Sequence, residues 1–386
     1  MTRVPVNPEI LRWAMVRAKQ NEETLSKKFP KIKHWLDGIE QPTLKQLERF
    51  ARVTHVPFGA LFLSRPPEES LSIPFFRTVR YEIPEKPSAE LLDTIESMKF
   101  RQSWMRAYLQ RIDAPPLDFV GSHSVEDDTE IIVRDMRRVL RMDEQWVKGI
   151  YTWEAALRQL RNRMEEVGIL VVVNSVVGNN THRKLSVHEF RGFVLVDPYA
   201  PLVFVNGGDS KAAQMFTLVH ELAHVFLGEE AIFDLSNMMP ASSKLEVKCN
   251  EVAAEFLVPR NYLEMNWDKH SEIIFEVERL ARLFKVSELV IARRALDLRF
   301  ISKEDFFRFY DRYQRRIREI QDQSKEQEGG GDFYTTTNLR IGRRFAQAVM
   351  DALRNGDVLY TDAYQLTGLY GGTFDKYVEW LASGQH

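Results

Sequence analysis

Apolar residues recur with the spacing of amphipathic helices over both ends of the chain and with that of strands only near its middle. In the N-terminal part, the apolar residues from Ile10 to Met15 fall on one face of a helix. Three short runs rich in valine and phenylalanine lie between residues 168 and 205, each bounded by turn residues, which is typical of strands. The pattern predicts an α+β protein that is mostly helical and has one small mixed sheet.

Changes in this pattern divide the chain into five segments. Residues 66–88 carry several prolines and no regular period, and Gly329-Gly330-Gly331 lies in a polar stretch, so both indicate linkers. The predicted segments are a helical module at 1–65, a linker at 66–88, a central domain with a helical pair at 89–300, a helix and glycine-rich linker at 301–332, and a C-terminal helical domain at 333–386. The longest helix of the last segment is predicted over 338–354.

Composition narrows the class of protein. A chain of 386 residues is long enough for several domains, and its formal net charge of −2 indicates neither a polycation nor an acidic tail. Its one cysteine, Cys249, excludes a disulfide framework and favours a reducing compartment. We find no signal-type apolar segment at the N-terminus and no apolar run of about eighteen residues. A cytoplasmic protein is therefore expected.

The candidate chemistry lies in an otherwise apolar run at residues 215–228. This run contains the motif H-E-x-x-H, with His220 and His224 four residues apart. On a helix both imidazoles lie on one face and can reach one metal ion, while Glu221 is rotated by about 100° from them. Because two histidines and a glutamate inside a buried helix are costly without a metal, the run predicts a zinc site.

A catalytic zinc requires a third protein ligand and one open position. The helix predicted from residue 244 to residue 258 offers Glu246, Glu251 and Glu255. Helical projection places Glu246 on the apolar face and the other two on the opposite, solvated face. With a single cysteine in the chain, histidine and carboxylate are the expected ligands, so Glu246 is predicted as the third ligand and Asp234 is the weaker alternative.

Two further parts of a peptidase site remain less defined. Zincins commonly place a sheet before the metal helix, with an edge strand along the cleft. The run immediately before the metal helix is expected to be that edge strand and to pair with an extended peptide; its residues are Leu202, Val203, Phe204, Val205 and Asn206. An oxyanion-stabilising group is expected as well, but His182, His188 and the tyrosines cannot be ranked from sequence.

Taken together, the two predicted helices resemble the ImmA/IrrE family of metallo-endopeptidases. The similarity covers about 150–300 and rests on the H-E-x-x-H motif, the four-residue step from Glu246 to Asn250, the pair Ala253-Ala254, and Leu257-Val258-Pro259. It implies that His220, His224 and Glu246 bind zinc and that Glu221 is the general base. Members of this family characteristically cut XRE-type repressors, and members fused to an XRE module are often antitoxins.

Residues 1–65 resemble the XRE family of helix-turn-helix DNA-binding domains. The likeness rests on Leu25-Ser26, on the run from Trp35 to Thr43 and on the helix that follows, although only Phe29-Pro30 connects the two central helices. This segment holds 12 Lys+Arg against 6 Asp+Glu, which favours a polyanion partner. The predicted DNA contacts are Lys27, Lys28, Lys31, Lys33 and His34; the alternative is a basic face that contacts only protein.

These observations predict a cytoplasmic zinc metallo-endopeptidase that acts as a regulator. The resemblances imply an antitoxin or repressor-cleaving role, with a repressor as substrate or a cognate toxin as partner, and with DNA bound through the N-terminal module. The alternative is a DNA-binding regulator and toxin-neutralising scaffold whose zinc site is structural or idle. An open fourth position at the metal favours the peptidase, whereas a site closed by the chain's own residues favours the scaffold.

Overall fold

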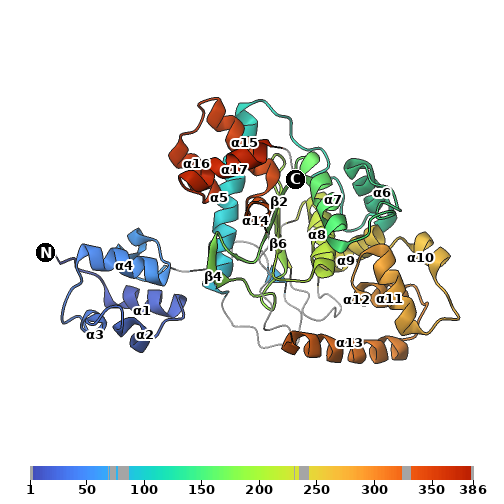
Figure 1. The fold of residues 1–386 in the computed structure, drawn as a ribbon, viewed down its shortest axis with the longest axis horizontal. Coiled ribbons are helices and arrows are strands. Elements are labelled where there is room, and N and C mark those ends of the chain that lie inside the picture. Colours follow the sequence, from blue (N-terminus) through green and yellow to red (C-terminus); the bar gives the residue numbers. More distant parts are fainter. Residues whose placement is uncertain are drawn as a thin grey trace. The chain divides into compact units, whose positions relative to one another are not determined.

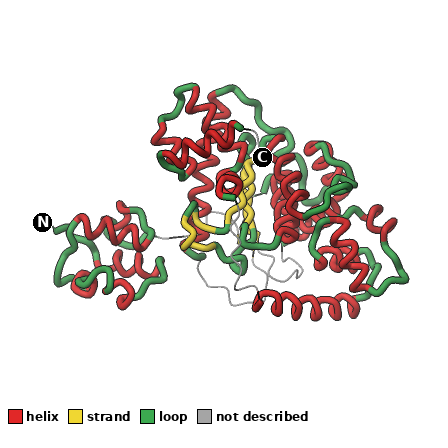
Figure 2. The backbone as a smooth tube through the Cα atoms, viewed as in Figure 1, coloured by secondary structure: helices red, strands yellow, loops and turns green. Residues whose placement is uncertain are grey.

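The computed structural model describes residues 3–67, 69, 75–76, 87–229, 231–233, 243–323 and 332–383. The chain forms two compact units, one from Met1–Ser72 with Pro84–Asp93 and the other from Ile73–Ile83 with Thr94–His386. Helices make up most of both units, and strands gather in the second (Figure 2), which confirms the predicted α+β class with mainly helical content. Within these described ranges, no helix is both long and apolar enough to span a bilayer.

The first unit is a bundle of short helices with its own apolar core. Asn7 caps the first helix through a bond from the Glu9 amide, and Thr43 and Gln46 form a capping box on the fourth. Trp35 and Phe50 lie fully inside and both pack against Phe29. The elements are α1 (Pro8–Arg17), α2 (Glu22–Ser26), α3 (Ile32–Leu36), α4 (Leu44–Thr54) and the 3₁₀ helix η1 (Phe58–Phe62).

The second unit is built on a mixed sheet with the strand order β1-β7-β5-β6-β2. Strand β2 runs parallel to β6, β5 runs antiparallel to both β6 and β7, and β1 is parallel to β7. Strands β2, β5 and β6 are buried on both faces, which explains their apolar sequences. The strands are β1 (Phe75–Phe76), β2 (Leu170–Asn174), β5 (Gly192–Leu195), β6 (Leu202–Asn206) and β7 (Ala231–Phe233), beside a separate hairpin of β3 (Val176–Val177) and β4 (Asn180–Lys184).

The predicted edge position of Leu202–Asn206 is wrong. Strand β6 lies between β5 and β2 and pairs with both along its length. Its backbone groups are therefore already bonded on both sides, and it has none left for an extended peptide. A strand buried on both faces has the same apolar sequence at an edge as in the interior, so the run itself gave no means of telling the two apart.

Helices of the second unit surround this sheet (Figure 1). Helix α8 packs against β5 and β6 and also against α9. Helices α11 and α12 form the predicted pair and contact each other and α13. The helices are α5 (Ala89–Arg111), α6 (Thr129–Leu140), α7 (Trp153–Glu166), α8 (Lys211–Leu227), α9 (Lys244–Leu257), α10 (Arg260–Asn266), α11 (Ile273–Phe284), α12 (Glu288–Asp297), α13 (Lys303–Gln323), α14 (Phe333–Ile341), α15 (Arg343–Arg354), α16 (Tyr360–Thr367) and α17 (Gly372–Ala382).

The long C-terminal helix predicted over 338–354 is interrupted at Gly342. This residue has φ of +86°, and a Cβ there would lie 3.0 Å from the Val171 carbonyl oxygen of β2. Glu165 accepts a hydrogen bond from the backbone amide of Arg344 at the start of α15. The break thus lets α14 and α15 pack against β2, a contact that no local pattern reveals.

Candidate metal centre

Helix α8 holds the H-E-x-x-H motif rigidly inside the second unit. Ser210 caps its start through a hydrogen bond from the Ala213 amide, and Gly228 ends it in the left-handed conformation with φ of +73°. Every residue from Gln214 to Leu227 is buried. Because the helix is enclosed on all sides, the directions of His220 and His224 are fixed by packing.

Three side-chain groups from α8 and α9 converge on one point. The Nε2 atoms of His220 and His224 lie 3.2 Å apart. Glu246 places Oε2 3.1 Å from His220 Nε2 and Oε1 3.2 Å from His224 Nε2. Tetrahedral zinc with bonds of about 2.0–2.1 Å holds its ligand atoms about 3.3 Å apart. The separations found here match that geometry, so the three residues fit a zinc ion.

Asn250 determines which nitrogen of His220 faces this point. Its Oδ1 lies 3.1 Å from His220 Nδ1, so Nδ1 donates and the neutral ring presents the Nε2 lone pair to Glu246. Burial lowers the pKa of His220 and keeps the ring neutral. A lone pair directed at a carboxylate oxygen is unfavourable unless a cation lies between them, which again fits a bound metal.

Glu246 is ionised in this environment. Burial acts to raise its pKa, but the closeness of His220 and His224 outweighs that effect and lowers the pKa to about 2. Its Oε1 lies within ion-pair distance of His224, yet no hydrogen bond with acceptable geometry reaches that oxygen from the residues that the structure describes. A metal would satisfy it. Ligation by the three residues stays a prediction that this geometry supports.

Glu221 lies beside the three groups without belonging to them. It is fully buried, and neither carboxylate oxygen has a hydrogen-bond partner within the described part of the chain. Burial, and secondly the charge of Glu246, raises its pKa well above the usual value. A buried carboxyl group without partners costs free energy and is retained where a proton must be moved.

A glycine in the sheet makes room for Glu221. A Cβ on Gly192 of β5 would lie 2.9 Å from Glu221 Oε1 and 2.6 Å from Thr217 Cγ2. Any other residue at this position would displace the carboxylate or the strand. An isolated glycine inside a strand signals such a close approach, so the sequence carried an indication of this contact that the prediction did not use.

Cys249 also lies in the cluster, although the sequence prediction set it aside. Its sulfur and one ligand atom each of His220 and His224 all lie within 4.8 Å of one another, and all three residues are buried. Burial raises the pKa of the Cys249 thiol well above its usual value, and the charges of Glu246 and Glu221 add to that effect. Glu246 lies 3.1 and 3.2 Å from the two histidines and is the more readily ionised donor, and we therefore retain it as the third ligand.

The remaining candidates lie away from this cluster. Glu251 is exposed and lies 3.8 Å from Lys248, and Glu255 pairs with Arg294. His182 and His188 are exposed, and none of their described contacts reaches the metal-binding histidines. Asp234 lies outside the described residues.

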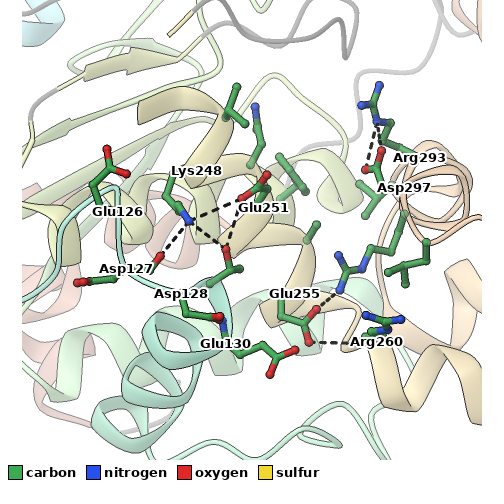
Figure 3. Close-up of a pocket in the computed structure, with 18 residues that line it drawn as sticks. Glu126, Asp127, Asp128, Glu130, Lys248, Glu251, Glu255, Arg260, Arg293 and Asp297 are labelled. Carbon is green, nitrogen blue, oxygen red and sulfur yellow. Dashed lines mark hydrogen bonds and ion pairs between the residues drawn. The ribbon is translucent and has the colours of Figure 1, made fainter. Parts of the chain in front are cut away.

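The outer face of α9 borders a cavity of about 770 Å³ (Figure 3). Its labelled side chains are charged and come from α6 and the loop before it, from α9, from the start of α10 and from α12, and several lining residues pair with one another. Two of its lining residues, Phe216 and Asn250, also contact His220. The cavity therefore reaches the groups that support the metal ligand but not the ligand atoms themselves.

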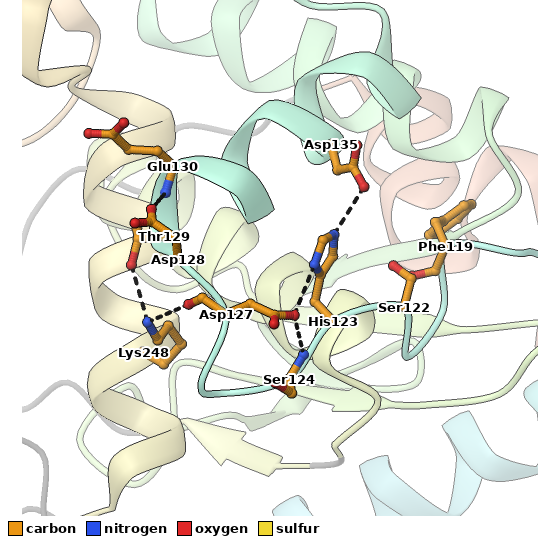
Figure 4. Close-up of polar contacts among 10 residues, drawn as sticks. All are labelled: Phe119, Ser122, His123, Ser124, Asp127, Asp128, Thr129, Glu130, Asp135 and Lys248. Carbon is orange, nitrogen blue, oxygen red and sulfur yellow. Dashed lines mark hydrogen bonds and ion pairs between the residues drawn. The ribbon is translucent and has the colours of Figure 1, made fainter.

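The loop before α6 is hydrogen-bonded to the end of α8, and Figure 4 shows the polar contacts that this loop makes with α6. The backbone amides of Gly121 and His123 donate to the carbonyls of Val225 and Phe226 at the end of α8. The His123 ring lies between two carboxylates, with Nδ1 3.2 Å from Asp127 and Nε2 3.1 Å from Asp135. These contacts hold the last turn of α8, directly after His224, in one position.

The part of the chain that contains these residues is similar to a peptidase family. Residues 164–296 match the family model Peptidase_M78, described as the IrrE N-terminal-like domain. This match includes α8, α9 and the strands β2, β5, β6 and β7 of the sheet, so it supports the ImmA/IrrE resemblance and a metallopeptidase-like domain. Residues 341–380 match DUF8813, a domain of unknown function. Neither match includes residues 1–65, and a search of curated proteins gave no match.

Alanine substitution of each proposed ligand tests the metal centre. His220→Ala, His224→Ala and Glu246→Ala should each reduce zinc affinity by more than the roughly 10–100-fold lost when an outer partner of a ligand is removed. Elemental analysis and chelator competition on the purified variants measure this. Glu251→Ala, on the solvated face of α9, is the control and should retain zinc. Stoichiometric, tightly held zinc in Glu246→Ala would refute the assignment of the third ligand.

The role of Asn250 is tested separately. Asn250→Ala removes the hydrogen bond that orients the His220 ring, and the expected result is a loss of about 10–100-fold in zinc affinity with the stoichiometry preserved at saturating metal. Competition against a chromophoric chelator gives the affinity. An affinity equal to that of wild type would show that packing alone orients His220.

Proposed function

We propose that the second unit is a zinc-dependent metallo-endopeptidase. One observation carries the proposal: His220, His224 and Glu246 converge at zinc-ligand distances, and next to them lies the buried carboxyl group of Glu221, which has no hydrogen-bond partner among the described residues. This arrangement matches the needs of peptide hydrolysis, which requires a Lewis acid and a base that handles one proton. The likeness of residues 164–296 to a peptidase family supports it independently.

Each residue of the site has a separate role in the proposed reaction. Zinc, when bound to His220, His224 and Glu246, supplies Lewis-acid chemistry that polarises a carbonyl and acidifies water. Glu221 accepts the proton of the attacking water and returns it to the leaving amine nitrogen. Burial, and secondly the charge of Glu246, raises the pKa of Glu221, which makes its carboxylate a stronger base for the proton of water. Asn250 holds His220 in the orientation that binds the metal.

We further propose a cytoplasmic regulatory role, as an antitoxin or as a peptidase that cleaves repressors. This role rests on the resemblance to fused ImmA/IrrE proteins. The proposed substrate is an XRE-type repressor, or the proposed partner is a cognate toxin. The second candidate function is a DNA-binding scaffold with a structural zinc. The burial of Cys249 within 4.8 Å of the histidine ligand atoms favours that alternative, because a fourth protein ligand would close the metal site.

DNA binding through the first unit is proposed from its exposed basic residues. Lys27, Lys28 and Lys33 are exposed on or beside α2 and α3. Lys31 and His34 are exposed as well, but both lie close to Glu40, with Lys31 Nζ 2.8 Å and His34 Nδ1 3.6 Å from its carboxylate. Glu40 thus offsets part of the positive charge. Helix α3 has five residues, so we expect contacts to phosphates more than to base edges.

Glu221→Gln tests the peptidase proposal. The amide has the shape of the carboxylate but cannot accept a proton, so activity should fall by at least about 10²-fold while zinc content stays unchanged. Cleavage of a co-expressed XRE-type repressor is followed by gel electrophoresis and mass spectrometry, with Glu251→Gln as the matched control. Cleavage at the wild-type rate by a zinc-loaded Glu221→Gln protein would show that Glu221 is not the base.

Charge reversal tests the DNA proposal. The double variant Lys31→Glu/Lys33→Glu should bind its own promoter more weakly at every sequence and lower the salt slope of log K by about 2, one unit for each lost phosphate contact. Gel-shift titrations over a series of salt concentrations measure both quantities. Lys269→Glu/Lys303→Glu, two exposed lysines of the second unit, is the charge-matched control. Equal, weak retardation of all three proteins would assign the basic face to a protein partner.

A further inference from the structure

The peptidase mechanism gives no role to the chain's single cysteine, which is buried in the metal centre. Cys249 is fully buried on α9, one turn after Glu246 and directly before Asn250, two residues that both contact His220. Its sulfur lies within 4.8 Å of a ligand atom of each metal-binding histidine. The same turn of α9 therefore presents a carboxylate, a thiol and an orienting amide to one face of α8.

The distances bring this sulfur within reach of a metal held by the other three residues. In tetrahedral zinc, a Zn–S bond of about 2.3 Å and a Zn–N bond of about 2.0–2.1 Å place sulfur and nitrogen about 3.6 Å apart. The sulfur of Cys249 and the ligand atoms of the two histidines lie within 4.8 Å of one another, so their separations exceed this spacing by at most about 1.2 Å.

A second observation indicates that a group is needed at this point. Within the described residues, both carboxylate oxygens of Glu221 and Oε1 of Glu246 are buried without a hydrogen-bond partner. Buried polar atoms are rarely left unsatisfied. Three unsatisfied carboxylate oxygens in one place indicate a cation there, and within the described residues the thiol of Cys249 is a further donor grouped with the two histidines.

We propose that Cys249 is the fourth ligand of the metal and closes the resting site to water. On metal binding the S–H bond breaks, the sulfur–metal bond forms and the proton passes to solvent, as when other cysteine sites are loaded. This inference rests on the proposed metal centre and specifies how the activity of that centre is regulated. The resting chain has four protein ligands, and hydrolysis requires that Cys249 be displaced to open the fourth position.

Cobalt substitution of the full-length protein tests the sulfur ligand without any measurement of activity. A thiolate bound to Co²⁺ gives an intense near-ultraviolet charge-transfer absorption, and since the chain has one cysteine, any such band must come from Cys249. We expect the band in wild type at one cobalt per chain and its loss in Cys249→Ala and Cys249→Ser with cobalt still bound. A stoichiometric cobalt protein without the band, or a band that survives in Cys249→Ala, would overturn the proposal.

X-ray absorption of the zinc-loaded wild-type protein also tests whether sulfur binds the metal, and it requires no variant. One sulfur scatterer at about 2.3 Å supports Cys249 as a ligand, and a shell of nitrogen and oxygen alone overturns it. A chain that binds neither metal refutes this inference and the proposed metallopeptidase together. The measurement therefore stands even if a substitution at the buried Cys249 prevents folding.

Activity separates a regulatory thiol from a purely structural one. Cys249→Ala should cleave its substrate at least about 10-fold faster than wild type, because its fourth position is free for water. A sulfur ligand shown by spectroscopy, together with an inactive Cys249→Ala that retains its metal, would support the coordination and refute the peptidase proposal. In that case the site is structural and the DNA-binding scaffold is the better description of the protein.

Discussion

The stability of the second unit depends on how the ionisable side chains buried between helices α8 and α9 are neutralised. Glu221 and Glu246 are at most 4% exposed and lie beside two fully buried histidines. Without a cation, carboxylates in such an interior cost several kcal/mol each. His220, His224 and Glu246 would hold a metal ion between them, and its positive charge would offset that cost. Metal binding and stability of this core are therefore linked, and loss of the metal should loosen the contact between α8 and α9.

The surrounding structure fixes the cluster from three directions. The sheet approaches from β5, where the absent side chain of Gly192 leaves space for Glu221. The loop through Gly121 and His123 binds the last carbonyls of α8. Asn250 holds the His220 ring from α9. Each contact restricts the rotation of a group at the site, which is the condition for a metal centre with defined geometry.

The sequence was sufficient to predict those site residues whose positions depend only on the period of one helix. The four-residue step from His220 to His224 and the projection that selects Glu246 both depend on helical period, and the structure brings these residues together. The position of β6 inside the sheet and the break at Gly342 depend on contacts between distant segments. The position of Cys249 in the cluster depends on the distance between two helices, which no local sequence pattern predicts.

The position of Cys249 also determines how the metal site can open. Cys249 and Glu246 lie one turn apart on the same rigid helix, so a shift of α9 that withdrew the sulfur would withdraw the carboxylate as well and release the metal. Opening must therefore come from rotation of the cysteine side chain alone. An incoming carbonyl or water can drive that rotation by competing for the fourth position. A helix that carries both a permanent ligand and a displaceable one can thus control access to the metal while the backbone stays in place.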